Sequence, residues 1–162
     1  MAPHFISLDF GLEVEFDEDY GATLHRSLHD IYDVKTLALC TYVLQVIPMG
    51  DSPAQLGIKL RRVNHLILKA SLIQEEFFGV TFFLNSCPNL ELLTIDLNTS
   101  KRVLSEYEPP FPFDEHPFLK GVTTFNPYPA VVPYCVKKNL KKVVVEGFKG
   151  TESELPVLRY LL

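Results

Sequence analysis

The sequence predicts an α/β fold in which short parallel strands alternate with flanking helices and loops in a solenoid of about five repeats. Three features of the 162-residue chain support this: a spaced apolar motif recurs, long connections separate its copies, and two connections have helical apolar spacing. Hydrophobic residues make up 47% of the chain and charged residues 22%. This balance is typical of globular proteins rather than disordered ones.

The recurring motif has the form apolar-x-x-apolar-x-apolar. Its copies start at residues 5, 34, 63, 90 and 140, so the steps are 29, 29, 27 and 50 residues. The first three steps fall within the roughly 20–29-residue period of leucine-rich repeats. The last two apolar positions are two residues apart and therefore face the same side of a strand. The copies are Phe5/Leu8/Phe10, Val34/Leu37/Leu39, Val63/Leu66/Leu68, Leu90/Leu93/Ile95 and Leu140/Val143/Val145.

Two connections between motif copies are predicted to contain helices, over residues 22–31 and 74–84, because their apolar residues recur at helical spacing. Ser71–Gln74 has the residue order of a capping box at the start of the second helix. The connection from Tyr42 to Arg61 contains prolines and glycines, and we expect a loop there. The apolar residues at helical spacing are Leu24, Leu28 and Ile31 in the first helix and Ile73, Phe77, Val80 and Leu84 in the second.

The chain is predicted to be one continuous solenoid in three parts: repeats over residues 1–100, a proline- and aromatic-rich insertion over 101–138, and a C-terminal strand and helix over 139–162. Seven of the twelve prolines lie in the insertion, which excludes helix and central strand there. We expect Ser153 to cap the last helix, with Pro156 in its first turn. The apolar residues at helical spacing in this helix are Leu155, Leu158 and Leu162.

Charge and cysteine content limit the classes of partner and the cellular compartment that we expect for this chain. The net charge is −5, and the densest basic segments, Lys59–Arg62 and Lys137–Lys142, are short, so we expect no nucleic-acid partner. The cysteines, Cys40, Cys87 and Cys135, are too few and too widely spaced for a disulfide framework, which favours the cytoplasm or the nucleus. We expect no signal peptide and no membrane partner, since no apolar run approaches the ~18–20 residues of a membrane span.

Residues that alternate with the predicted core positions should form the sheet face on which partners usually bind. The predicted face mixes both signs of charge with apolar side chains, which suits a protein partner better than a phosphate backbone. The residues predicted to bind are Lys35, Thr36, Asn64, His65, Glu91, Leu92, Thr94, Lys141 and Lys142, and Ile6, Ser7, Asp9, Ala38, Ile67 and Val144 are predicted to share their face.

No motif predicts catalysis. His25 and His29 are four residues apart on a predicted helix, a spacing that can bind a metal ion, but the glutamate of a metalloprotease motif is missing between them. Asp17–Asp19 lacks the glycine and the spaced oxygen ligands of a calcium loop. We therefore expect no enzyme activity, no cofactor and no bound metal, with a metal-dependent hydrolase built on the two histidines as a minor alternative.

Two stretches resemble a known family. Residues 85–95, which contain Cys-Pro-Asn-Leu-Glu at 87–91, resemble the repeat start of plant F-box/leucine-rich-repeat proteins. Residues 139–162, with Gly-Phe-Lys-Gly at 147–150 and a final Tyr-Leu-Leu, resemble the FBD module that ends many of these proteins. The resemblance implies the substrate-recognition region of a receptor in an SCF-type ubiquitin ligase, in which an F-box binds a Skp1-type adaptor and the repeats present a protein substrate.

The resemblance thus predicts a non-catalytic protein-interaction module whose substrate it does not identify. Because the first predicted strand begins at Phe5, we expect no F-box before the repeats in this chain and expect a Skp1-type adaptor to bind only a longer form. One alternative is a small-ligand-sensing repeat domain with a pocket beneath the insertion. Another is a truncated product without independent function, since the edge of the first strand is open. The predicted pocket residues are Phe111, Phe113, Phe118, Tyr128 and Tyr134.

Overall fold

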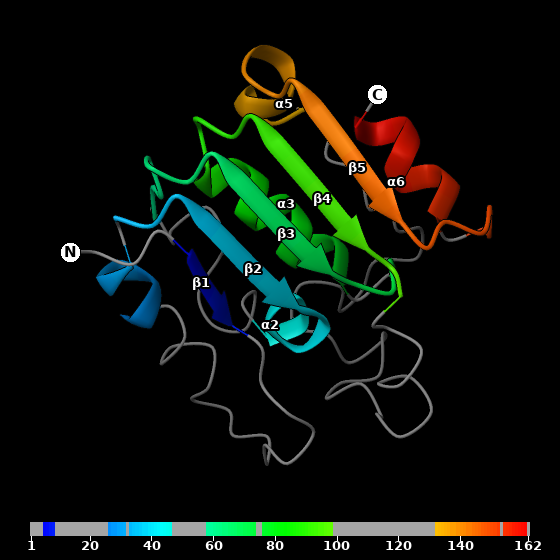
Figure 1. The fold of residues 1–162 in the computed structure, drawn as a ribbon, viewed down its shortest axis with the longest axis horizontal. Helices are drawn as coiled ribbons and strands as arrows, with labels where there is room; N and C mark the ends of the chain where they lie inside the picture. The colour runs from blue at the N-terminus through cyan, green and yellow to red at the C-terminus, as the bar shows by residue number, and fades with distance from the viewer. Residues whose placement is uncertain are drawn as a thin grey trace, which may run out of the picture.

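The computed structural model describes residues 5–8, 26–31, 33–46, 58–73, 76–98, 132–152 and 154–161. Within these ranges, one five-stranded parallel sheet runs in the order β1-β2-β3-β4-β5, and α2 and α3 cover one of its faces (Figure 1). The predicted α/β class and parallel strands are confirmed. The strands are β1 (Phe5–Leu8), β2 (Thr36–Cys40), β3 (His65–Lys69), β4 (Leu92–Asp96) and β5 (Lys142–Glu146). The helices are α2 (Thr41–Val46), α3 (Phe77–Ser86), α5 (Tyr134–Lys138) and α6 (Glu154–Leu161).

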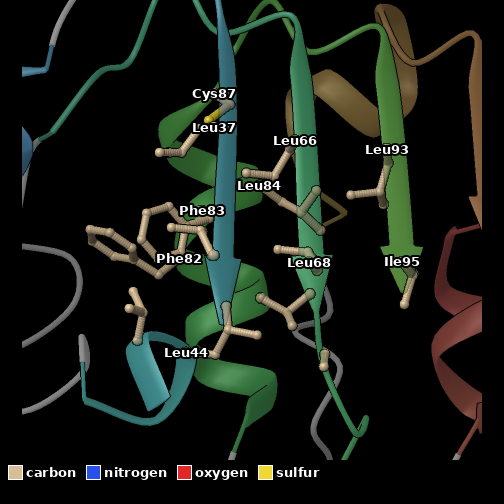
Figure 2. Packing of buried hydrophobic residues seen from close by; sticks show 14 of the residues in the cluster. Leu37, Leu44, Leu66, Leu68, Phe82, Phe83, Leu84, Cys87, Leu93 and Ile95 are labelled. Carbon is tan, nitrogen blue, oxygen red and sulfur yellow. The ribbon is translucent and has the colours of Figure 1, made fainter. Parts of the chain in front are cut away.

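Four of the five motif copies occupy equivalent places in the sheet. Their strand leucines, isoleucine and valines are register partners in neighbouring strands and face the same side. On that side they pack against α3, whose Phe83 and Leu84 point toward the leucines of β2 and β3 (Figure 2). The core-facing rows are Leu37/Leu66/Leu93/Val143 and Leu39/Leu68/Ile95/Val145, fully buried in β2–β4 and half-buried in β5.

The predicted register of the first copy is wrong by two residues. β1 pairs Ile6 with Leu37, whereas the motif would place Leu8 there, so Ile6 and Leu8 face the core and Phe5 is 54% exposed. Ile6 therefore does not lie on the predicted binding face. Apolar residues at 5, 6, 8 and 10 are compatible with either register, and only strand pairing distinguishes them. Phe10 and Asp9 lie outside the described residues.

The connection after β2 begins with a helix rather than the predicted loop. α2 contains neither proline nor glycine, and the first of these breakers is Pro48. The apolar spacing of the other predicted helices is confirmed in part. Leu28 is buried in a helical segment over residues 26–30, and Phe77, Val80 and Leu84 are buried in α3. No helix in the described ranges has the length and apolar content to cross a membrane.

Glu76, immediately before α3, links the segment that follows β3 to that helix through hydrogen bonds. The predicted capping box at Ser71–Gln74 is wrong, because Ser71 contributes its backbone N–H and not its hydroxyl. That N–H donates to both carboxylate oxygens of Glu76, at 3.1 and 3.2 Å, and the N–H groups of Leu72 and Ile73 donate as well. Leu72 adopts a positive φ of 55°, an unfavourable backbone conformation that its fully buried side chain offsets.

Glu154 repeats this arrangement at the start of α6. One of its carboxylate oxygens accepts the N–H groups of Lys149, Gly150 and Thr151 at 3.0, 2.8 and 3.1 Å. These donors precede the glutamate by five, four and three residues, as they do at Glu76. Gly150, with φ of 73°, takes the place of Leu72. Within the described ranges, the same carboxylate-bound turn therefore connects a strand to a helix twice.

The buried face of α6 is not the predicted one. Val157 and Leu161 are buried, whereas Leu155 is 43% exposed. Pro156 is the third helical residue and lies in the first turn, as predicted. Ser153, the predicted cap, lies outside the described residues.

Gly79 allows α3 and α2 to pack backbone against backbone. A Cβ atom at position 79 would lie 2.1 Å from the carbonyl oxygen of Leu44 and 2.5 Å from its Cα. No side chain can be accommodated at these distances unless the two helices separate.

We expect Gly79→Ala to lower the free energy of unfolding by about 1–3 kcal/mol, because the methyl group forces α2 and α3 apart. Alanine would otherwise stabilise a helix by about 1 kcal/mol relative to glycine. Urea unfolding followed by circular dichroism measures the difference, with Asn85→Ala, at an exposed position of the same helix, as the control. Equal or greater stability of Gly79→Ala would contradict the backbone contact.

The two glutamates should give the protein opposite pH dependences. Burial raises the pKa of Glu76 from its ordinary 4.5 to about 7, although the hydroxyl of Thr41 and three backbone donors oppose this. Burial also tends to raise the pKa of Glu154, but the three backbone N–H groups and the Thr151 hydroxyl together outweigh burial and lower that pKa.

A raised pKa in the folded state stabilises the fold fully below pH 4.5, and this contribution is lost as the pH rises through about 7. We expect the free energy of unfolding to fall by on the order of 3 kcal/mol across this window. Glu76→Gln should remove that dependence in urea titrations. Glu154→Gln should leave it intact and remove only a loss of stability below pH 4.5. Identical profiles for wild type and Glu76→Gln would refute the assignment.

Candidate functional site

The sheet face opposite the core is the candidate site, and it is called the outer face below. Ala38 and Cys40 of β2 are buried on it, whereas its residues in β3, β4 and β5 are half-buried or exposed. The solvent-accessible part of the outer face therefore lies over β3, β4 and β5. In register, the rows of this face are Phe5/Thr36/His65/Leu92/Lys142, Ser7/Ala38/Ile67/Thr94/Val144 and Cys40/Lys69/Asp96/Glu146.

The predicted binding residues fall into two groups. Five lie on the outer face itself: Thr36, His65, Leu92, Thr94 and Lys142. The other four are exposed and immediately precede the strands: Lys35, Asn64, Glu91 and Lys141. This second group belongs to the amino-terminal rim of the sheet, defined here as residues 33–36, 60–65, 87–92 and 137–142.

Backbone hydrogen bonds hold the rim in a regular arrangement. The carbonyl groups of Lys35, Asn64 and Glu91 each accept the N–H groups of two consecutive residues in the next repeat, at 2.8 to 3.2 Å. The last of these contacts spans the 50-residue step between β4 and β5 with the same geometry as the others. The rim is therefore continuous from β2 to β5, whatever the length of the connection.

Two asparagines at equivalent positions link neighbouring repeats through their side chains. Asn89 donates its Nδ2 to the carbonyl oxygen of Arg61 at 2.8 Å, and Asn139 donates its Nδ2 to that of Pro88 at 2.7 Å. The two acceptor residues, Arg61 and Pro88, also occupy equivalent positions. Each lies in the repeat that precedes its asparagine, as the strand register shows. The asparagines thus satisfy carbonyl groups that no strand bond reaches and fix the rim turns relative to one another.

Polar pairs also order side chains over the central strands. The imidazole Nε2 of His65 lies 3.0 Å from the hydroxyl oxygen of Thr94, across β3 and β4. Burial lowers the pKa of His65, so its ring is neutral at pH 7. On the rim, Lys141 and Glu91 form an ion pair at 2.9 Å. These contacts restrict the side chains that a partner would meet, which reduces the entropy lost on binding.

The described residues contain no group of three or more histidine, cysteine, aspartate or glutamate side chains placed to bind a metal ion. His29 is exposed, while its predicted partner His25 and the acidic segment Asp17–Asp19 lie outside the described residues. Of the predicted small-ligand pocket, only Tyr134 is described, and it is 63% exposed.

The cysteines of the described regions are buried and free. Cys135 donates its thiol to the carbonyl oxygen of Leu84 at 3.0 Å, and burial raises its pKa to about 11. Burial raises the pKa of Cys87 as well. Because the thiolate is the reactive form, both thiols are suited to packing rather than to nucleophilic chemistry.

Comparisons with known proteins agree with this architecture. Residues 128–162, which include α5, β5 and α6, match the FBD family. A predicted F-box/LRR-repeat protein of Arabidopsis thaliana is 34% identical over 165 residues, which cover 97% of this chain and 32% of that protein. An F-box protein of the same plant is 33% identical over 155 residues, covering 96% of this chain and 31% of that protein.

The chain is similar over nearly its whole length to plant F-box proteins, and residues 128–162 match the FBD family. It spans about a third of the length of the curated relatives it matches. No solved structure matches it significantly. The family resemblance of residues 85–95 and 139–162 is thereby confirmed, and the two segments lie side by side, because β4 pairs with β5.

One feature of the site was not predicted, namely the gathering of cations along the rim. The basic segments Lys59–Arg62 and Lys137–Lys142 are about 75 residues apart in the sequence. The sheet places Arg61 and Arg62 of the first segment and all of the second on its amino-terminal rim, since each segment ends at the first residue of a strand or shortly before it. The signal was available in the motif, because each basic segment overlaps the turn that precedes a motif copy.

We expect Asn139→Ala to lower the free energy of unfolding by about 1–2 kcal/mol, because the carbonyl group of Pro88 loses its donor. Asn89→Ala should have a similar effect, and the losses should be roughly additive, since the two asparagines share no partner. Thermal and urea unfolding measure both variants against Asn64→Ala, an exposed rim position that should change stability by less than about 0.5 kcal/mol. Equal effects at all three positions would rule out the linking role.

Proposed function

We propose that the chain is a non-catalytic protein-interaction module, the substrate-recognition part of an F-box receptor in an SCF-type ubiquitin ligase. The observation that carries this proposal is the outer face of the sheet. It is accessible over β3–β5, and neighbouring repeats contribute equivalent residues to it in register. The names of the relatives, F-box and F-box/LRR-repeat proteins, support the assignment to this class of receptor.

We further propose that the sheet is one arc of a leucine-rich-repeat solenoid. Each repeat supplies one strand, a turn at the amino-terminal rim and the same pair of backbone bonds to the next repeat. Strands are joined in sequence order without exception in the described part of the chain. These are the features that distinguish stacked repeats from doubly wound parallel sheets, in which the strand order reverses.

The mixture of side chains on the outer face favours a protein partner. Ile67 and Leu92 supply apolar contact, while His65 and Thr94 supply polar groups already held in place. A Skp1-type adaptor would bind a form that carries an F-box. We place this function in the cytoplasm and/or the nucleus, where the three free cysteines would remain reduced.

The adaptor step can be tested by pull-down. The 162-residue chain and the same chain fused behind an intact F-box are each incubated with a purified Skp1-type adaptor. We expect only the fusion to bind the adaptor. Binding by the bare chain would place an adaptor site within the repeats and contradict the division of roles.

Substrate recognition is tested by quantitative proteomics in plant cells expressing the fusion. A substrate is expected to be depleted by the fusion but not by the fusion carrying Ile67→Arg, which places a charged side chain at the centre of the outer face. The matched control is Asn85→Arg on the exposed side of α3, which should leave depletion unchanged. The proposal fails if no depleted protein depends on Ile67, or if both substitutions abolish depletion equally.

A further inference from the structure

The amino-terminal rim is strongly cationic in a chain whose net charge is −5. It carries seven lysine and arginine side chains and two carboxylates. The cations are Lys35, Arg61, Arg62, Lys137, Lys138, Lys141 and Lys142, and the anions are Asp33 and Glu91.

Both carboxylates of the rim are already paired with cations. Asp33 forms an ion pair with Arg62, and Glu91 forms one with Lys141. The remaining five cations are exposed, and none of them forms an ion pair with another described residue. These five are Lys35, Arg61, Lys137, Lys138 and Lys142.

The carboxyl-terminal ends of the same strands show no such excess. Over the last strand residue and the three that follow it, the described charged residues are Lys69 and Lys149 on one side and Asp96 and Glu146 on the other. The cationic excess is therefore a property of one rim. Attraction for an anionic ligand is thus directed toward one end of the outer face.

The dimensions of the rim fit an extended peptide. Parallel strands lie about 4.8 Å apart, so the rim measures about 14 Å from β2 to β5. An extended chain rises about 3.3 Å per residue, so four or five residues span this length. Acidic side chains of such a segment would lie within reach of Lys35 at β2, Arg61 at β3 and the lysines at β5, whereas the turn before β4 carries no cation. Two of the β5 lysines belong to α5, which lies at this end of the rim (Figure 1).

We propose that the amino-terminal rim binds an acidic, extended segment of the protein partner, which crosses the strands from β2 to β5. This inference rests on the proposed function, because it names the chemistry of the partner that the outer face would recognise. A protein segment fits better than a nucleic acid. The outer face next to the rim presents the apolar side chains of Ile67 and Leu92 beside polar ones, a mixture that suits a protein better than a phosphate backbone.

The probe for this site is a fluorescein-labelled hexaglutamate peptide, titrated into the full chain and followed by fluorescence anisotropy. We expect binding at about 50 mM salt and weaker binding at about 200 mM, because salt screens exposed charges. Lys142→Glu should weaken binding about fivefold, and Lys35→Glu combined with Lys142→Glu about tenfold or more, since an exposed ion pair contributes up to about fivefold and reversal adds repulsion. The neutral Lys142→Gln should have a smaller effect.

The matched control is Arg159→Glu on α6, an exposed cation outside the rim with the same change in charge. It should alter the dissociation constant by less than about twofold. Equal weakening by Arg159→Glu and Lys142→Glu would overturn the proposal, because binding would then follow net charge alone. Tighter binding of a single-stranded RNA hexamer than of the peptide would overturn it in favour of a nucleic-acid site. Circular dichroism of each variant confirms that the fold is retained.

The result is separable from the test of the proposed function. If depletion of a substrate requires Ile67 but is unchanged by Lys142→Glu, the acidic-segment proposal fails and the receptor function stands. If the peptide binds the rim as expected but no protein is depleted, the receptor function fails and the rim is an anion-binding surface of another role. Loss of depletion with Lys142→Glu, but not with Arg159→Glu, supports both proposals together.

Discussion

Parallel pairing in register is the constraint on which the rest of the structure depends. Each strand can join the next only after the chain has returned to the same end of the sheet, and the return must bury its own apolar residues. Leu66 and Leu93 occupy equivalent core positions because each new strand begins at the same place relative to the one before it. Hydrogen bonds to the carbonyl groups of Lys35, Asn64 and Glu91 fix that place. A slip of one residue would expose every core leucine to solvent.

The chain that follows β3 and β5 contains a second recurrent feature, a carboxylate that binds three backbone N–H groups. At Glu76 and Glu154 it turns the chain from a strand toward a helix, using Leu72 in one case and Gly150 in the other at positive φ. The FBD segment is therefore built on the same strand–turn–helix plan as the repeat that contains β3 and α3. Greater burial at Glu76 opposes ionisation there, whereas the donors at Glu154 favour it.

Periodicity in the sequence predicts the strands well because the core positions of β2–β5 tolerate only apolar side chains. It fails at β1, where four apolar residues among positions 5–10 are compatible with two registers. It also fails at helix starts. A serine followed three residues later by glutamine resembles a capping box, but the decisive group is the carboxylate of Glu76, whose partners are backbone groups that leave no trace in residue type. Strand alternation accounts for the outer-face residues Thr36, His65, Leu92, Thr94 and Lys142, whereas Lys35, Asn64, Glu91 and Lys141 precede the strands.

The rim charge is a different kind of property, since it arises only when distant segments are brought together. Arg61 and Lys138 are 77 residues apart, yet the register that aligns Leu66 with Leu93, and Leu93 with Val143, places both on one rim. The connection between β4 and β5 can change in length without moving these cations, because the rim bonds from Glu91 to Lys141 and Lys142 fix them. The place of the rim cations therefore depends on the strand register and on these backbone bonds, and not on the length of the connection.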